Sequence, residues 1–202
     1  MLLSLSHKFV FVANLKSASS AIEVALGPKA EVRITETRFG KHDSLSVISQ
    51  KFAWVKRYVP YDEFRVFAVL RDPADYLLSL YNSHNKAGFD GKPHSTKGLS
   101  FDRFLYEWCE RSWQARPQHL RFIDEHGRFK LSHLIRFDNL ETEFGQVCGS
   151  LGLGKIDLGR RNSSPAILRR EDLSAAQIAH IRERYAEDYA WMEKPPRLSQ
   201  PR

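Results

Sequence analysis

The stretch Phe9-Val10-Phe11-Val12-Ala13-Asn14-Leu15-Lys16-Ser17-Ala18-Ser19-Ser20 joins an unbroken apolar run to a short polar turn. A continuous β-branched and aromatic run is typical of a strand that is buried on both faces. After the turn, Ile22, Ala25 and Leu26 fall at helical spacing until Gly27-Pro28 stops the pattern. The stretch therefore predicts a strand, a turn and a helix in succession.

The same order returns at Val66–Leu70, an apolar run that is followed at once by Arg71-Asp72-Pro73. Asp72 is a natural N-cap and Pro73 suits the first helical position. Further strands are expected at 32–34 and 131–137, and further helices at 43–53, 101–113, 118–123, 140–151 and 174–192, with a loop at 82–100. Buried strands that alternate with helices predict an α/β domain with a mainly parallel sheet.

Composition places the 202-residue chain among ordinary globular proteins, with 42% hydrophobic and 27% charged residues. We expect one domain over residues 1–194 and a flexible, Pro-rich tail over 195–202. The net charge of +7 favours an anionic partner, although a basic surface that only aids solubility is the alternative.

Cys109 and Cys148 are the only cysteines, and neither belongs to a C-x-x-C pattern. This excludes a disulfide framework and favours a reducing compartment. The apolar run at 9–13 is too short for a signal core or a membrane span. We therefore expect a cytoplasmic protein with no transmembrane segment.

The turn after the first strand has the residues of a phosphate site. A helix N-terminus offers free N–H groups, Ser17, Ser19 and Ser20 add hydroxyls, and Lys16 adds a full positive charge. The turn has no glycine, so it is not the G-x-x-x-x-G-K-[ST] loop of ATP- and GTP-binding proteins. An ordinary polar turn is the alternative interpretation.

Arg71 stands at the end of the second buried strand, and Ser79 lies two helical turns further on. A guanidinium group can bind a phosphate through two parallel hydrogen bonds. A salt bridge or a helix cap within the same turn is the alternative role for Arg71.

Taken together, these segments resemble the sulfotransferases that use 3′-phosphoadenosine 5′-phosphosulfate (PAPS), in particular the carbohydrate-type branch. Residues 16–20 resemble their 5′-phosphosulfate loop, and residues 67–73, continuing to Ser79 and Tyr81, resemble their 3′-phosphate motif. Residues 135–140 leading to 151–153, and the closing Tyr185, Asp188 and Tyr189, are similar to later family elements. The chain departs from the family pattern at Ser19, where Gly is frequent, at Ser20, where Thr is common, and at Tyr76, where many relatives have Arg.

The resemblance implies a three-layer, P-loop-like fold and the transfer of a sulfuryl group to a hydroxyl or amine, with adenosine 3′,5′-bisphosphate as product and no metal. Lys16 would stabilise the leaving 5′-phosphate oxygen and act catalytically. The expected donor-binding residues are Lys16, Ser17, Ala18, Ser19 and Ser20 at the 5′-phosphate, Arg71 and Ser79 at the 3′-phosphate, and Asn162 and Ser163 from a later basic turn. A solvated charge run is the alternative for that turn.

His42, in Gly40-Lys41-His42-Asp43, resembles a Lys-His element of the glycan branch and is the candidate base. A histidine at a helix start is expected to titrate near neutral pH and to accept the acceptor's proton. Glu36 is the reserve candidate, and a surface histidine is the alternative role for His42. The other histidines are expected to be solvated.

The loop at 82–100 is expected to form or cover part of the acceptor site, because it is long and rich in Gly, Lys and His. The expected acceptor is a glycan or another polyhydroxyl compound, and no nucleic acid partner is expected. The glycines at 149, 152 and 154 indicate a helix C-cap and turn. Two other functions stay open: a nucleotide-dependent kinase on the same fold, and a catalytically inactive nucleotide- or glycan-binding module.

Overall fold

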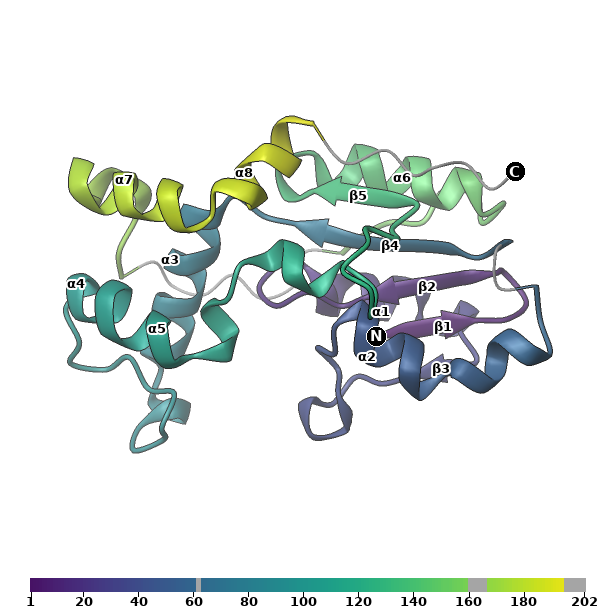
Figure 1. The fold of residues 1–202 in the computed structure, drawn as a ribbon, viewed down its shortest axis with the longest axis horizontal. Helices are drawn as coiled ribbons and strands as arrows, with labels where there is room; N and C mark the ends of the chain where they lie inside the picture. Colours follow the sequence, from purple (N-terminus) through teal and green to yellow (C-terminus); the bar gives the residue numbers. More distant parts are fainter. Residues whose placement is uncertain (61–62, 160–166, 195–202) are drawn as a thin grey trace.

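The computed structural model describes residues 1–60, 63–159 and 167–194 (Figure 1). These residues form a five-stranded sheet in the order β3-β1-β2-β4-β5. The strands are β1 (Leu2–Ser4), β2 (Phe9–Val12), β3 (Val32–Arg33), β4 (Arg65–Leu70) and β5 (His133–Arg136). β1 runs antiparallel to β2 and β3, whereas β2, β4 and β5 pair in parallel. Four strands thus share one direction, which confirms the prediction of an α/β domain with a mainly parallel sheet.

β1 is the element that the sequence pattern did not reveal. It is only three residues long, with Leu2 opposite Phe11 and Ser4 opposite Phe9 in the register. A run of this length shows no periodicity, so only its pairing with β2 defines it as a strand.

The helices of the described residues follow most of the predicted segments. They are α1 (Ser19–Leu26), α2 (Leu45–Lys51), α3 (Pro73–His84), α4 (Phe101–Arg103), α5 (Cys109–Arg111), α6 (Leu140–Ser150), α7 (Ala175–Arg184) and α8 (Ala186–Glu193). As predicted, the Asp72 carboxylate caps α3 by accepting from the N–H groups of Ala74 and Asp75. The predicted capping box of Ser174 and Gln177 opens α7.

Three predicted helices differ from the observed ones. The helix expected at 101–113 contains a π-helical segment, Phe104–Trp108, between α4 and α5. The helix expected at 118–123 is a single 3₁₀ segment, η8 (Gln118–Arg121). The helix expected from 174 to 192 divides at Tyr185, whose buried side chain sits between α7 and α8. In each case tertiary packing overrides a local pattern.

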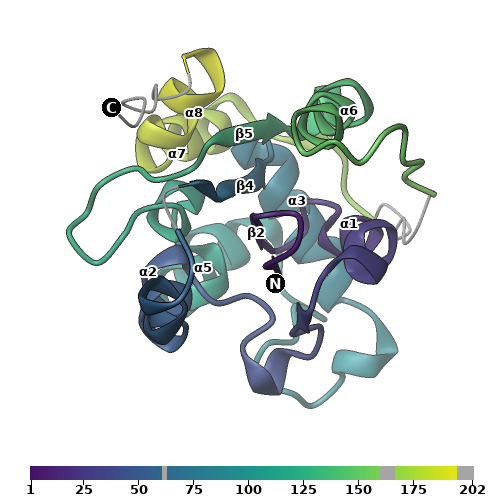
Figure 2. The same cartoon turned by 90° about the vertical axis from the view of Figure 1, so that its right-hand side faces the viewer.

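Helices pack on both faces of the sheet, as Figure 2 shows along its edge. On one face the buried strand residues contact α1 and α6, with Phe11 and Phe67 against Ile22 and Phe144. On the other face the buried strand residues contact α2, α8 and the segment that follows η8. The residues packed together there are Val10, Val12, Ala68, Leu70, Leu45, Ile48, Phe122 and Trp191. Side chains alternate along a strand, so one apolar run supplies both cores.

A third core lies beyond the carboxyl ends of β2, β4 and β5, where α3 packs with α4, α5 and α7 (Figure 1). Tyr76, Phe104 and Tyr185 are buried in it. The loops that leave β2 and β4 therefore run between the sheet and this helical cluster. Ligands of parallel α/β sheets bind at this edge.

The segment 82–84, expected as loop, completes α3, so the loop begins at Asn85. Gly152 and Gly154 adopt positive φ after α6, as the C-cap interpretation requires. Cys109 and Cys148 are buried and unpaired. No helix in the described ranges is both long and apolar enough to cross a bilayer. The tail predicted at 195–202 lies outside the described residues.

Candidate functional site

The loops after β2 and β4 are joined by one buried side chain, Gln118 of η8. Its Oε1 accepts from Asn14 Nδ2 at 2.8 Å and from the Arg71 N–H at 3.2 Å. Its Nε2 donates to the Arg71 carbonyl at 2.8 Å. Asn14 also donates to Val69 O at 3.1 Å. Gln118 thus fixes the start of both loops relative to each other, and Asn14 and Gln118 are fully buried.

The turn between β2 and α1 holds two residues in the left-handed region, Lys16 at φ 54° and Ala18 at φ 56°. A non-glycine residue in this region costs about 1 kcal/mol or more, and such strain clusters at functional sites. Ala18 is the N-cap of α1, and no side chain caps this helix end. The first N–H groups of α1 are therefore free to bind an anion.

The serines of this turn take different positions. The Ser17 hydroxyl is buried and donates to Leu15 O at 3.0 Å, so its side chain is engaged within the turn. The Ser20 hydroxyl accepts from Lys41 Nζ at 3.2 Å. Lys41 in turn pairs with the buried Glu23 carboxylate at 2.7 Å. The Ser19 hydroxyl, on a buried residue, has no hydrogen bond within the described residues. The arrangement leaves the backbone N–H groups and the Ser19 hydroxyl, rather than the Ser17 hydroxyl, as the anion donors of the turn.

Lys16 and Arg71, the cations of the two predicted phosphate motifs, lie in contact through a hydrogen bond. Arg71 Nη1 donates to the Lys16 carbonyl at 2.9 Å, and its guanidinium lies 4.4 Å from the centre of the Phe137 ring. The buried Arg71 Nε has no hydrogen-bond partner among the described residues. Burial, followed by the charges of Lys86 and Arg71, lowers the pKa of Lys16 to about 8. Crowded cations of this kind favour binding of an anion.

The acidic residues next to Arg71 are engaged elsewhere. Arg170 Nη1 contacts Asp72 at 2.9 Å and Asp75 at 3.5 Å. No ion pair of Lys16 or Arg71 with a carboxylate occurs within the described ranges. The structure places Ser79 half-buried on α3 and does not join it to Arg71 through any hydrogen bond of the described residues.

His42 is held against the first residue after β2. Its Nδ1 lies 2.7 Å from the Ala13 carbonyl oxygen. A carbonyl only accepts, so Nδ1 carries the proton and Nε2 of the neutral ring keeps its lone pair. This is the tautomer that a general base needs.

The pKa of His42 differs from the near-neutral value expected from the sequence. Burial lowers it to about 4, and the charges of Lys41 and Arg121 act in the same direction. The His42 ring is therefore uncharged at neutral pH, with its single proton on Nδ1. The reserve candidate, Glu36, is exposed and pairs with Arg38 at 2.8 Å on the surface.

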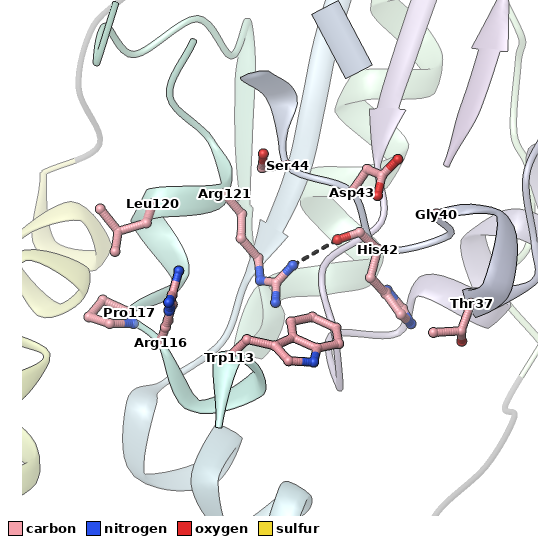
Figure 3. Close-up of a pocket in the computed structure, with 10 residues that line it drawn as sticks. All are labelled: Thr37, Gly40, His42, Asp43, Ser44, Trp113, Arg116, Pro117, Leu120 and Arg121. Carbon is pink, nitrogen blue, oxygen red and sulfur yellow. Dashed lines mark hydrogen bonds between the residues drawn. The ribbon is translucent and has the colours of Figure 1, made fainter. Parts of the chain in front are cut away.

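A cavity of about 430 Å³ opens beside His42 (Figure 3). One side comes from the loop before α2, including Thr37, Gly40, His42, Asp43 and Ser44, and the other from Trp113, Arg116, Pro117, Leu120 and Arg121. Gly40 has φ 91°, and a Cβ on it would lie 2.2 Å from the Asp43 carboxylate. Only glycine fits this turn, which presents His42 to the cavity.

Buried polar groups anchor the segment 113–121 that forms the second wall. The Tyr76 and Tyr185 hydroxyls donate to the carbonyls of Gln114 and Ala115. Asp188 accepts from the N–H groups of Gln118 and His119, each at 2.8 Å. Tyr76 is thus a fully buried anchor of this wall.

The chain from Asn85 to Ser100 folds back on α3 rather than over His42. Thr96 donates its hydroxyl to Tyr81 O at 2.8 Å and is fully buried. Pro93, His94 and Leu99 line a second cavity, of about 400 Å³, which Trp113 also lines. The predicted acceptor loop therefore meets the cavity of His42 only through Trp113.

The expectation that the other histidines are solvated is wrong for four of them. His133 Nδ1 and His180 Nε2 are buried without a hydrogen-bond partner among the described residues. His84 is buried between Phe89 and Trp108, with ring centroids at 4.4 and 5.8 Å. His119 Nδ1 contacts Asp188 at 2.8 Å. The predicted nucleotide contacts Asn162 and Ser163 lie outside the described residues. No cluster of three or more His, Cys, Asp or Glu suited to a metal ion is found in the ranges that the structure describes.

Comparison with family models, with curated proteins and with solved structures gives no match.

Sequence reasoning missed the residues that anchor or line the two sites, namely Asn14, Gln118, Trp113, Arg116 and Arg121. One signal was available: two arginines and a tryptophan occur within nine residues at 113–121, next to a proline. The helical interpretation of 118–123 concealed it.

Proposed function

We propose that this protein is a sulfotransferase that transfers a sulfuryl group from PAPS to a hydroxyl or amine of an acceptor, with a carbohydrate as the favoured class. One observation carries the proposal: the half-buried cations Lys16 and Arg71 meet at the uncapped N-terminus of α1. Neither pairs with a carboxylate of the described residues, which suits a donor with two anionic ends. The resemblance of both segments to the phosphate motifs of PAPS-dependent sulfotransferases adds the identity of the donor.

The fold and location belong to the same proposal. Helices on both faces of a mostly parallel sheet, with the site at its carboxyl edge, support a three-layer, P-loop-like fold. The absence of a glycine in the turn at 13–20 separates it from ATP-binding loops. Two buried, unpaired cysteines fit a reducing compartment, and we infer the cytoplasm.

In the proposed reaction the acceptor oxygen attacks the sulfur as the bond from sulfur to the 5′-phosphate oxygen breaks. The acceptor proton passes to Nε2 of His42, which the Ala13 carbonyl holds in the required tautomer. Lys16 and the N-terminus of α1 neutralise the charge that develops on the leaving 5′-phosphate. Adenosine 3′,5′-bisphosphate is released.

Arg71 provides the selection of the donor. Its guanidinium lies on the Phe137 ring, and among the described residues only Nη1 is engaged, with the Lys16 carbonyl, so the remaining N–H groups are the donors proposed for a 3′-phosphate. A bidentate contact of this type distinguishes PAPS from nucleotides without a 3′-phosphate.

The test is an assay of ³⁵S transfer from labelled PAPS to a panel of glycans and small hydroxyl compounds, with EDTA present. We expect transfer to at least one acceptor, and none with Lys16→Ala. The matched control is Lys155→Ala, which removes an exposed lysine after α6. Absence of transfer to the whole panel, or transfer of phosphate from ATP that requires Mg²⁺, contradicts the proposal.

A further inference from the structure

The cavity beside His42 has an excess of positive charge. Arg116 and Arg121 both line it. The Asp43 carboxylate, its acidic lining residue, already pairs with Lys51. Neither arginine forms an ion pair with any carboxylate in the described part of the chain. Two cations without counter-charges in one cavity attract an anionic ligand.

Arg121 is built into the cavity wall rather than extended into solvent. Its side chain is buried, with 8% of the residue exposed. Nη1 donates to the His42 carbonyl at 2.8 Å, and the guanidinium lies 5.1 Å from the centre of the Trp113 ring (Figure 3). The buried Nε has no partner among the described residues. A guanidinium has five N–H donors, so Arg121 keeps donors for a ligand.

Trp113 supplies the apolar surface of the cavity. It is 41% exposed although Arg121 lies over one part of its ring. An aromatic side chain beside a fixed cation is a common design of small-molecule sites, where the apolar surface holds a ring and the cation orients it.

We propose that this cavity binds an acceptor that carries an anionic group, a carboxylate or a sulfate, held by Arg121 and Arg116 while the acceptor ring packs on Trp113. The proposal rests on the proposed function, which makes His42 the base of the same cavity. It deepens that function, since it restricts the acceptor to acidic compounds.

A bound anion has a consequence for His42. Lys41, Arg121 and the terminal amino group act on this histidine and lower its pKa. The other charged groups of the cavity lining are Asp43 and Arg116. An anion between the arginines and the ring opposes this effect, because it favours the protonated imidazole. Binding of the acidic acceptor thus raises the basicity of His42 in the complex.

The test compares three methyl glycosides as probes: methyl β-D-glucuronide, the 6-sulfate of methyl β-D-glucoside, and neutral methyl β-D-glucoside. The readout is the NMR shift of the Trp113 indole N–H, assigned with Trp113→Phe, in the absence of nucleotide. We expect at least one charged probe to bind about tenfold or more tightly than the neutral one. We also expect the His42 imidazole to titrate at higher pH in that complex.

Two variants localise the contact. Arg116→Gln and Arg121→Lys should each weaken binding of the charged probe at least threefold and leave the neutral probe unchanged. The control Arg182→Gln, at an exposed position on α7, should change neither. If Arg121→Lys fails to fold, the proposal is tested by Arg116→Gln, at an exposed position, and by the comparison of charged with neutral probes. Equal affinity for charged and neutral probes, or unchanged binding with Arg116→Gln, overturns the proposal.

The result is separable from the proposed function. Binding of adenosine 3′,5′-bisphosphate is measured in the same samples and does not depend on these arginines. Bisphosphate binding without preference for charged glycosides overturns only the acidic-acceptor inference. Preference for charged glycosides without bisphosphate binding overturns the proposed sulfotransferase function and leaves the assignment of an anion site in this cavity intact.

Discussion

Replacement of Gln118 by Leu removes the side chain that joins the two phosphate loops. Three hydrogen bonds are lost: from Asn14 Nδ2 at 2.8 Å, from the Arg71 N–H at 3.2 Å and to the Arg71 carbonyl at 2.8 Å. Gln118 is fully buried and leucine has a similar volume, so the main loss is in hydrogen bonds. At about 1–1.5 kcal/mol for each bond, with partners left unsatisfied, the cost is about 3–5 kcal/mol.

For a domain of this size, a cost of about 3–5 kcal/mol lowers Tm by on the order of 10 °C. Calorimetric melting of the purified variant measures this fall in Tm. The control is Gln146→Leu, at an exposed position on α6, which should change the free energy of unfolding by no more than about 0.5 kcal/mol. We also expect weaker binding of adenosine 3′,5′-bisphosphate, because the loops are no longer fixed to each other. A Tm that falls by no more than the control's would refute the role assigned to Gln118.

Three further predictions concern the site. Lys16→Ala should abolish transfer and weaken bisphosphate binding only moderately. The affinity of the wild-type protein for the bisphosphate should fall as pH rises through about 8, where Lys16 loses its charge. A bisphosphate affinity that calorimetry finds independent of pH contradicts this prediction. His42→Ala should lower kcat by about 10²–10⁴-fold and remove the acidic limb of the wild-type kcat/KM profile, which begins near pH 4 because this profile reports the enzyme without acceptor. An acceptor that raises the pKa of His42 moves the acidic limb of the kcat profile instead. A loss below tenfold with the limb intact would transfer the role to Glu36, to be tested as Glu36→Gln. Shortening the chain within 90–95, which spares Lys86, should raise KM for the acceptor and leave donor affinity unchanged; an unaltered KM counts against the acceptor loop.

The sequence predicted the elements whose signals are local. The apolar runs at 9–13 and 66–70 became buried parallel strands, and the cap at Asp72 began α3. Elements defined by long-range contacts escaped prediction. β1 is defined by pairing with β2, and the break at Tyr185 by packing of that ring in the third core.

The candidate site shows the same division. Lys16 and Arg71 follow neighbouring parallel strands, so their proximity followed from topology. The cations of the second wall, Arg116 and Arg121, reach the cavity because buried partners on α3 and α8 anchor their segment. The low pKa of His42 depends on burial, which no residue pattern near position 42 encodes.

Calorimetric titration with adenosine 3′,5′-bisphosphate and with AMP tests the central claim most directly. The two ligands differ only in the 3′-phosphate that Arg71 is proposed to bind. Loss of a charge-assisted, bidentate contact costs on the order of 2–3 kcal/mol, so the bisphosphate should bind about 30–150-fold more tightly. Arg71→Lys should reduce this preference. Equal affinity of the wild-type protein for the two nucleotides would contradict the assignment of a PAPS-dependent sulfotransferase.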